Sequence, residues 1–66
     1  MKIILNGKET EVDGGKTLLQ LLEDRKIVPQ MVACEINSNL IRRKEYPNAL
    51  IREGDRIEIL QMIGGG

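Results

Sequence analysis

The sequence has 66 residues, with ten basic and ten acidic side chains, no histidine and one cysteine. A chain of this length folds as one small domain, and its balanced charge argues against a nucleic-acid-binding protein, which would carry a basic excess. Without histidine the usual general base near neutral pH is missing, and the single thiol has no imidazole to activate it. We therefore expect no catalytic residue, no metal ligand set and no enzymatic activity of this chain on its own.

The sequence contains no apolar run of about 18 residues that could span a membrane, and no basic and apolar signal segment at its N-terminus. Its only aromatic residue is Tyr46, so the stacking surface with which single-strand binders hold bases is missing. We expect a cytoplasmic protein that binds neither nucleic acid nor membrane and is a monomer when free.

The first twelve residues predict a β-hairpin. Two β-rich runs, residues 2–6 and 8–12, flank Asn6-Gly7, a dipeptide that is the strongest short signal for a tight hairpin turn. Side chains alternate between the two faces of a strand. The side chains expected to face the core are those of Ile3, Leu5, Thr10 and Val12.

A helix is expected to begin after Thr17 and to end by Ile27, because Pro29 disfavours helical backbone in the residue before it. Thr17 can cap the first turn, and Gln20 three residues later completes a capping box. The spacing of three leucines predicts an apolar stripe on one side of the helix. These residues are Leu18, Leu21 and Leu22, with Leu19 on the flank.

The second half of the chain predicts further strands. Residues 31–37 alternate in polarity, residues 40–41 could form a short strand, and residues 56–63 form the last strand, with Ile57 and Ile59 facing inward. Between them, residues 42–48 are expected to be a polar loop broken by Pro47, and residues 49–51 to contribute to the core. The order β-β-α-β-β-β indicates an α+β domain of two layers.

Three short features resemble functional sites but are better explained by structure. Gly15-Lys16-Thr17 resembles the end of a phosphate-binding loop, but the full pattern needs a glycine where Thr10 stands. We interpret this stretch as a turn before the helix. Cys34 lies on the apolar face of its strand and is interpreted as a core residue. Residues 42–44, Arg-Arg-Lys, are interpreted as a solvated run, with a patch for an anionic partner as the alternative.

Several apolar residues fall on the strand faces opposite the expected core. If the first and last strands lie side by side, these residues form an exposed apolar patch, which often marks a partner surface. The alternative is that a crossing loop covers them, or that they are scattered surface residues without a role. The predicted docking residues are Ile4, Leu60, Met62, Met31 and Ala33.

The sequence ends in Gly64-Gly65-Gly66, which buries no side chain and is expected to be a flexible tail. Three extended residues reach roughly 10 Å, so the tail would present a thin carboxylate beyond the last strand. The alternative is a frayed or artificial end without function.

Taken in order, four features of the chain resemble the ThiS family of bacterial sulfur carrier proteins of thiamine biosynthesis. They are Asn6-Gly7, the Gly-x-Thr-Leu-x-x-Leu-Leu segment at 15–22, the Glu-Gly-Asp-x-Ile-Glu-Ile segment at 53–59, and the final Gly-Gly. The resemblance implies a single-domain, ubiquitin-like β-grasp fold over residues 1–63, with a mixed sheet of four to five strands and one main helix packed on one face. Gly64 is an extra glycine that lengthens the tail, residues 64–66.

The resemblance also implies a mechanism. A ThiF-like adenylyltransferase would use ATP and Mg²⁺ to adenylate the carboxylate of Gly66. Sulfur from a persulfide would then convert it to a thiocarboxylate, the sulfur source for a ThiG-like thiazole synthase. This chain would bind no cofactor itself.

Three other functions remain open at this point. The chain could be a sulfur carrier of another pathway, such as the molybdopterin type, or a ubiquitin-like modifier that is joined through Gly66 to lysine amines. It could also be a plain interaction domain with an inert tail.

Overall fold

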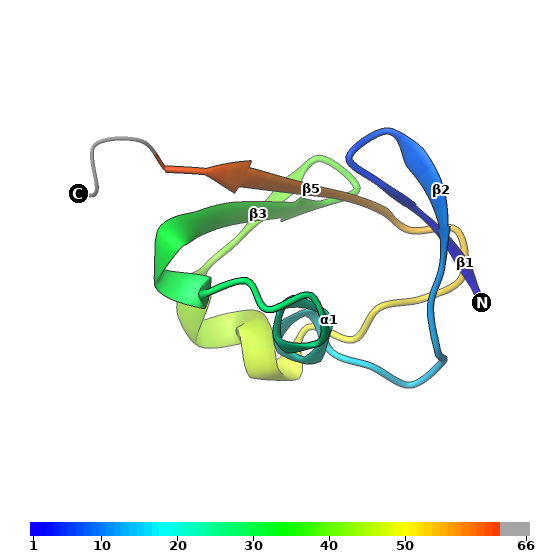
Figure 1. Ribbon diagram of the computed structural model, residues 1–66, viewed down its shortest axis with the longest axis horizontal. Coiled ribbons are helices and arrows are strands. Elements are labelled where there is room, and N and C mark those ends of the chain that lie inside the picture. Colours follow the sequence, from blue (N-terminus) through cyan, green and yellow to red (C-terminus); the bar gives the residue numbers. More distant parts are fainter. Residues whose placement is uncertain (63–66) are drawn as a thin grey trace.

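The computed structural model describes residues 1–62 and shows a β-sheet covered on one face by helices (Figure 1). Ile63, the predicted end of the last strand, and the predicted tail Gly64–Gly66 lie outside the described residues. The elements are β1 (Lys2–Leu5), β2 (Lys8–Glu11), α1 (Leu18–Asp24), η1 (Pro29–Met31), β3 (Val32–Ile36), β4 (Asn39–Ile41), η2 (Arg43–Asn48) and β5 (Arg56–Gln61), where η denotes a 3₁₀ helix.

The five strands form one mixed sheet in the order β2-β1-β5-β3-β4. β1 and β5 pair in parallel, whereas β2 pairs antiparallel to β1, and β3 pairs antiparallel to both β4 and β5. The last strand therefore lies in the middle of the sheet. This arrangement confirms the predicted α+β fold, with a mixed sheet and one main helix.

Two tight turns connect the antiparallel pairs. At the first turn Asn6 has a φ of 50° and Gly7 a φ of 81°, and at the second Asn37 and Ser38 have φ values of 53° and 71°. Positive φ at both central residues is typical of type I′ turns, whose twist matches the twist of the flanking strands. The predicted Asn6-Gly7 hairpin is thus confirmed.

The helix α1 begins as predicted. The Gln20 amide donates to Thr17 Oγ1 at 3.2 Å, and the Thr17 amide donates to Gln20 Oε1 at 2.9 Å, which completes the capping box. Leu18, Leu21 and Leu22 are buried against the sheet. The helix ends at Asp24, within the limit that Pro29 sets.

The core lies between the sheet and the helical layer. It consists of Ile3, Leu5, Leu18, Leu21, Leu22, Val32, Cys34, Tyr46, Ile51 and Ile57. Val12 and Ile59 pack against it while partly buried. Val12 follows the last residue of β2, so the predicted second strand is one residue too long.

The prediction for residues 42–48 was wrong. All of them except Arg42 form the 3₁₀ helix η2, with Pro47 inside it, and Tyr46 is only 2% exposed. A 3₁₀ turn tolerates proline better than a longer α-helix does, because few of its amides need a partner within the helix. The polar side chains of this segment lie on its outer side, and the ring of Tyr46 completes the core beside Cys34.

The ends of the other strands also differ from the prediction. β1 ends at Leu5, and β4 begins at Asn39. Met31 belongs to η1 rather than to β3, β3 ends at Ile36, and β5 ends at Gln61. Leu50 is 47% exposed, so Ile51 alone of the two large residues at 50–51 enters the core. Within residues 1–62 no helix is long and apolar enough to cross a membrane.

Candidate functional site

The end of β5 is held to the start of β3 by the backbone. The Met62 amide donates to the Met31 carbonyl oxygen at 3.0 Å, and Ala33 pairs directly with Leu60. The chain continues from this point toward residues 63–66. Whatever lies close to Met62 therefore surrounds the base of the predicted tail.

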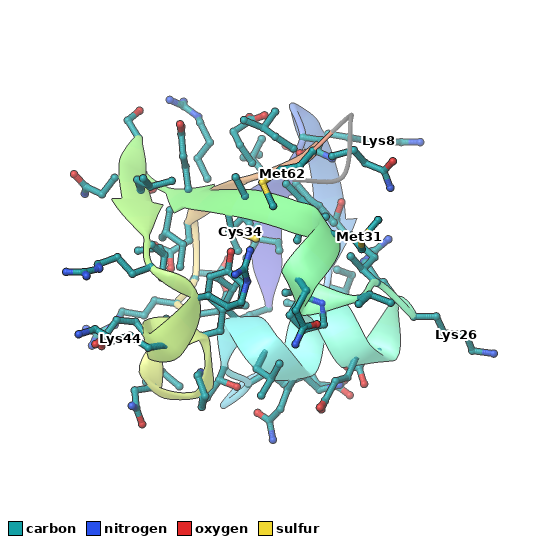
Figure 2. The ribbon with its side chains drawn as sticks, turned by 90° about the vertical axis from the view of Figure 1, so that its left-hand side faces the viewer. Lys8, Lys26, Met31, Cys34, Lys44 and Met62 are labelled. Atoms are coloured by element: carbon teal, nitrogen blue, oxygen red, sulfur yellow. The ribbon has the colours of Figure 1, made fainter. Side chains whose placement is uncertain are left out.

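Apolar side chains lie around this place, where the outer face of the sheet carries no helix within residues 1–62. Leu60 and Met31 are each 50% exposed and Met62 is 40% exposed, while Ala33 is half-buried. Figure 2 looks at the molecule from this end and shows Met62 on one side of β3, the core residue Cys34 on the other, and Met31 beside the turn that leads into β3. We name Met31, Ala33, Leu60 and Met62 the apolar patch.

Ile4 does not join the apolar patch, although β1 and β5 do lie side by side, which was the condition for such a patch. The parallel register pairs Ile4 with Arg56 at the beginning of β5, whereas Leu60 stands four residues further along that strand. Ile4 is half-buried on the outer face. Ala33 of β3, Leu60 of β5 and Met62, just after β5, thus lie at neighbouring positions. Met31 borders them at the end of η1, and Ile4 lies apart from them.

The same outer face carries residues that sequence reasoning missed. Leu40 is 67% exposed and pairs with Glu35, and Glu35 also pairs with Glu58 across β3 and β5. The alternation of polarity placed Glu35 on this face, but nothing in the sequence indicated which strands would be its neighbours. Val28, 55% exposed, lies directly before η1.

Two asparagines hold β5 in place from opposite sides. Asn6 Oδ1 accepts from the Ile59 amide at 2.8 Å, and Asn37 Oδ1 accepts from the Arg56 amide at 2.9 Å. Asn37 Nδ2 also donates to Asp55 Oδ1 at 3.0 Å. Both side chains continue the hydrogen bonding of the sheet where the β1 and β3 backbones turn away.

One residue of the basic run at 42–44, Arg43, contributes to the structure. Arg43 Nε donates to the Pro29 carbonyl oxygen at 3.3 Å, and Arg43 Nη2 lies 3.5 Å from the Gln30 carbonyl oxygen. Arg43 therefore links η2 to η1, the helix that ends at Met31. Arg42 and Lys44 are exposed, as a solvated run predicts.

Cys34 is fully buried and contacts Tyr46. Burial raises the pKa of the Cys34 thiol above its usual value, although its hydrogen bond with Tyr46 acts in the opposite direction. A thiol that is buried and protonated is a poor nucleophile. This confirms the interpretation of Cys34 as a core residue.

The stretch Gly15-Lys16-Thr17 is a turn, as interpreted. Lys16 Nζ forms a short ion pair with Asp24 and lies 3.9 Å from Asp13 Oδ2. The hydrogen bond with Asp24 is the main cause that raises the pKa of Lys16. Because Thr17 caps the helix and Lys16 is already paired with two carboxylates, this turn is not arranged to bind phosphate.

Within residues 1–62, no group of three or more acidic or sulfur-bearing side chains could hold a metal ion. The predicted covalent site, Gly66, and its neighbours Gly64 and Gly65 lie outside the described residues. The described part of the chain thus provides an apolar surface, a firmly held β5 and an inert thiol.

Several relatives are about as long as this chain. The chain is similar in fold to a thiamine biosynthesis protein (ThiS) of Geobacter metallireducens, with a TM-score of 0.85, 30% identity and full coverage of both chains. It is 29% identical to the sulfur carrier protein ThiS of Escherichia coli over the full length of both. It is 32% identical to that of Thermus thermophilus, over 94% of this chain and 95% of the relative.

Other relatives are much longer. The chain is 39% identical over its full length to a thiazole synthase of Magnetococcus marinus, of which it spans about a fifth (20%). It also spans 20% of a thiazole synthase of Paramagnetospirillum magneticum, at 32% identity. The model of the ThiS family matches residues 3–66. The chain therefore belongs to the ThiS family.

Proposed function

We propose that the chain is a sulfur carrier of thiamine biosynthesis, which holds the sulfur as a thiocarboxylate on Gly66. The observation that carries the proposal is the family match over residues 3–66, together with full-length similarity to proteins named sulfur carriers. A carrier needs no catalytic groups of its own. The absence of histidine from the sequence and the burial of Cys34 agree with that role.

The chemistry follows from the properties of a carboxylate. A terminal carboxyl group has a pKa of about 3.5 and is ionised at neutral pH, which makes it a poor electrophile. One carboxylate oxygen of Gly66 would attack the α-phosphorus of ATP, with Mg²⁺, and release pyrophosphate. Persulfide sulfur would then attack the activated carbonyl carbon and displace AMP, which gives an acyl disulfide. A second thiol, from the enzyme or an added reductant, would attack the donor sulfur of this S–S bond, so that the thiocarboxylate stays on Gly66 and the two thiols end as a disulfide. These steps belong to a ThiF-like adenylyltransferase.

The carrier itself would contribute a thin tail and a docking surface. Glycine has no Cβ, so Gly64–Gly66 could enter a narrow channel that a larger residue would block. The apolar patch at Met31, Ala33, Leu60 and Met62 would dock on the activating enzyme close to the base of this tail. The central position of β5 would keep the tail and the patch at a constant distance from each other.

The loaded carrier would deliver its sulfur to a ThiG-like thiazole synthase. Support comes from the two long relatives, which are named thiazole synthases and contain a region similar to this whole chain. In such proteins a carrier-like region and a synthase belong to one polypeptide. The activating enzyme and the persulfide donor rest on the family resemblance.

The test is an intact-mass measurement of the purified protein after incubation with ATP, Mg²⁺, a persulfide donor and a ThiF-like enzyme. We expect a gain equal to the replacement of one oxygen by sulfur, located by fragmentation at Gly66, and no gain when ATP is omitted. An unchanged mass, with an enzyme proven active on its own carrier, would contradict the proposal. So would a cellular protein in which Gly66 is followed by further residues that are never removed.

A further inference from the structure

Two carboxylates face each other directly on the outer side of the sheet. Glu35 on β3 and Glu58 on β5 are opposite one another in the antiparallel register. Their neighbours Cys34 and Ile57 are buried in the core, so both glutamates point to the outer face. Directly opposite residues have Cβ atoms only about 5 Å apart, and like charges in this position destabilise a sheet.

The described residues do not compensate this repulsion. The ion pairs among residues 1–62 involve the N-terminus, Lys2 and Lys16, and none of them includes Glu35 or Glu58. Arg56 stands two residues before Glu58 on the same face, yet it forms no ion pair with either glutamate. Both glutamates are half-buried, so water screens them less than it screens fully exposed carboxylates.

The carboxylate pair borders the apolar patch. Ala33 and Leu60 form the next pair on this face, two positions along β3 and β5 from Glu35 and Glu58. A partner surface that covers Leu60 would therefore also approach the carboxylates. Local rules are broken most often where a residue serves function, because the protein tolerates the loss of stability there.

Building on the proposed function, we propose that Glu35 and Glu58 bind a lysine or arginine side chain of the activating adenylyltransferase, next to its contact with the apolar patch. One cation between the two carboxylates would remove their mutual repulsion and fix the orientation of the carrier. Charge complementarity of this kind contributes mainly to the rate of encounter and to specificity.

The activating enzyme is the expected partner because the carboxylates border the apolar patch, which the proposed function assigns to contact with that enzyme. Two proteins on separate chains meet by diffusion. Electrostatic attraction accelerates that step and becomes weaker as salt is added.

The experiment uses the full chain and its Glu35→Gln and Glu58→Gln variants, which keep the shape and remove one charge each. Glu23→Gln is the matched control, because Glu23 is exposed on α1, away from the sheet face, and takes part in none of the ion pairs of residues 1–62. Two quantities are measured for each protein. One is the midpoint of thermal unfolding, and the other is the KM for the carrier in adenylation at low and high salt.

We expect the two sheet variants to unfold roughly 2 °C or more above the parent protein, because repulsion is removed. At low salt their KM should rise by about tenfold with kcat within a factor of about two, and their KM should depend less on salt. The control should change neither quantity.

A lower unfolding midpoint would overturn the proposal, because the glutamates would then be structural. An unchanged KM at low salt would overturn it too, as would a defect confined to sulfur delivery to the synthase. If the parent protein itself is not adenylated, the proposed function fails, whereas a loaded parent with unaffected variants refutes this inference alone.

Discussion

Asn6 Oδ1 accepts a hydrogen bond from the Ile59 amide at 2.8 Å, so the turn of the first hairpin is tied to the last strand. β1 ends at Leu5, and the Asn6 amide makes the next backbone hydrogen bond of this pairing, to the Ile57 carbonyl oxygen at 2.8 Å. The Asn6 side chain takes over as the acceptor. One residue thus closes the hairpin and extends the parallel pairing that holds β5 in the middle of the sheet.

Replacing Asn6 by glycine should destabilise the protein by about 1 kcal/mol, because the Ile59 amide loses its acceptor. Glycine accepts the positive φ of this position, so backbone strain does not contribute. Asn6→Asp, which keeps an acceptor oxygen, is the control and should lose less. Urea unfolding measures the free energy of unfolding of each variant and of the parent protein. An equal loss of stability in Asn6→Gly and Asn6→Asp would contradict this explanation.

Leu60→Asp should weaken docking on the activating enzyme and leave the fold intact. Leu60 is 50% exposed on the outer face, so a charge there remains in water in the free protein but would be buried in a complex. The matched control is Leu50→Asp, since Leu50 is similarly exposed (47%) and lies outside the sheet. Met62→Asp should behave like Leu60→Asp.

The measurements are circular dichroism for the fold and the KM for the carrier in adenylation. Loss of the folded spectrum in Leu60→Asp would mean that its assignment to the outer face is wrong. Equal effects of Leu60→Asp and Leu50→Asp on KM would exclude a specific role of the apolar patch.

Gly66→Ala should fold normally and load no sulfur. The side chain added at this position is small, and the buried residues of the described core lie between Ile3 and Ile57. In the activating enzyme, however, the added Cβ would meet the walls of a channel shaped for glycine. The intact mass after the loading reaction shows whether sulfur has been added, and a fully loaded Gly66→Ala protein would refute the steric argument.

Because Tyr46 is buried, we expect the folded protein to lose stability at high pH. Burial, with the Cys34 contact as a further cause, raises the pKa of Tyr46 from its usual 10 to about 12. The unfolded chain therefore loses this proton at lower pH than the folded protein does. The contribution of the Tyr46 hydroxyl to the free energy of unfolding is therefore fully present below pH 10 and decreases as the pH rises toward 12.

The titration is simple to read, because Tyr46 is the only tyrosine and the sequence has no tryptophan. Ultraviolet absorbance of the tyrosinate should show a midpoint near 12 for the folded protein and near 10 in denaturant. Tyr46→Phe is the control for stability and should remove this part of the pH dependence. A midpoint near 10 without denaturant would contradict the buried position of the ring.

The features that could be predicted from the sequence are local. Asn6-Gly7 specifies a turn with positive φ, and the capping box of Thr17 and Gln20 specifies where a helix begins. Alternating polarity sorts the side chains of each strand between two faces. Each of these signals depends on a few neighbouring residues, so the sequence carries it in full.

The tertiary structure alone decided which of these local elements meet. It paired Ile4 with Arg56 rather than with Leu60, placed Glu35 opposite Glu58, and buried Tyr46 from a segment of polar composition. Strand order and register between distant segments depend on how all apolar faces pack at once. No short stretch of sequence contains that information, and the surface beside the last strand results from it.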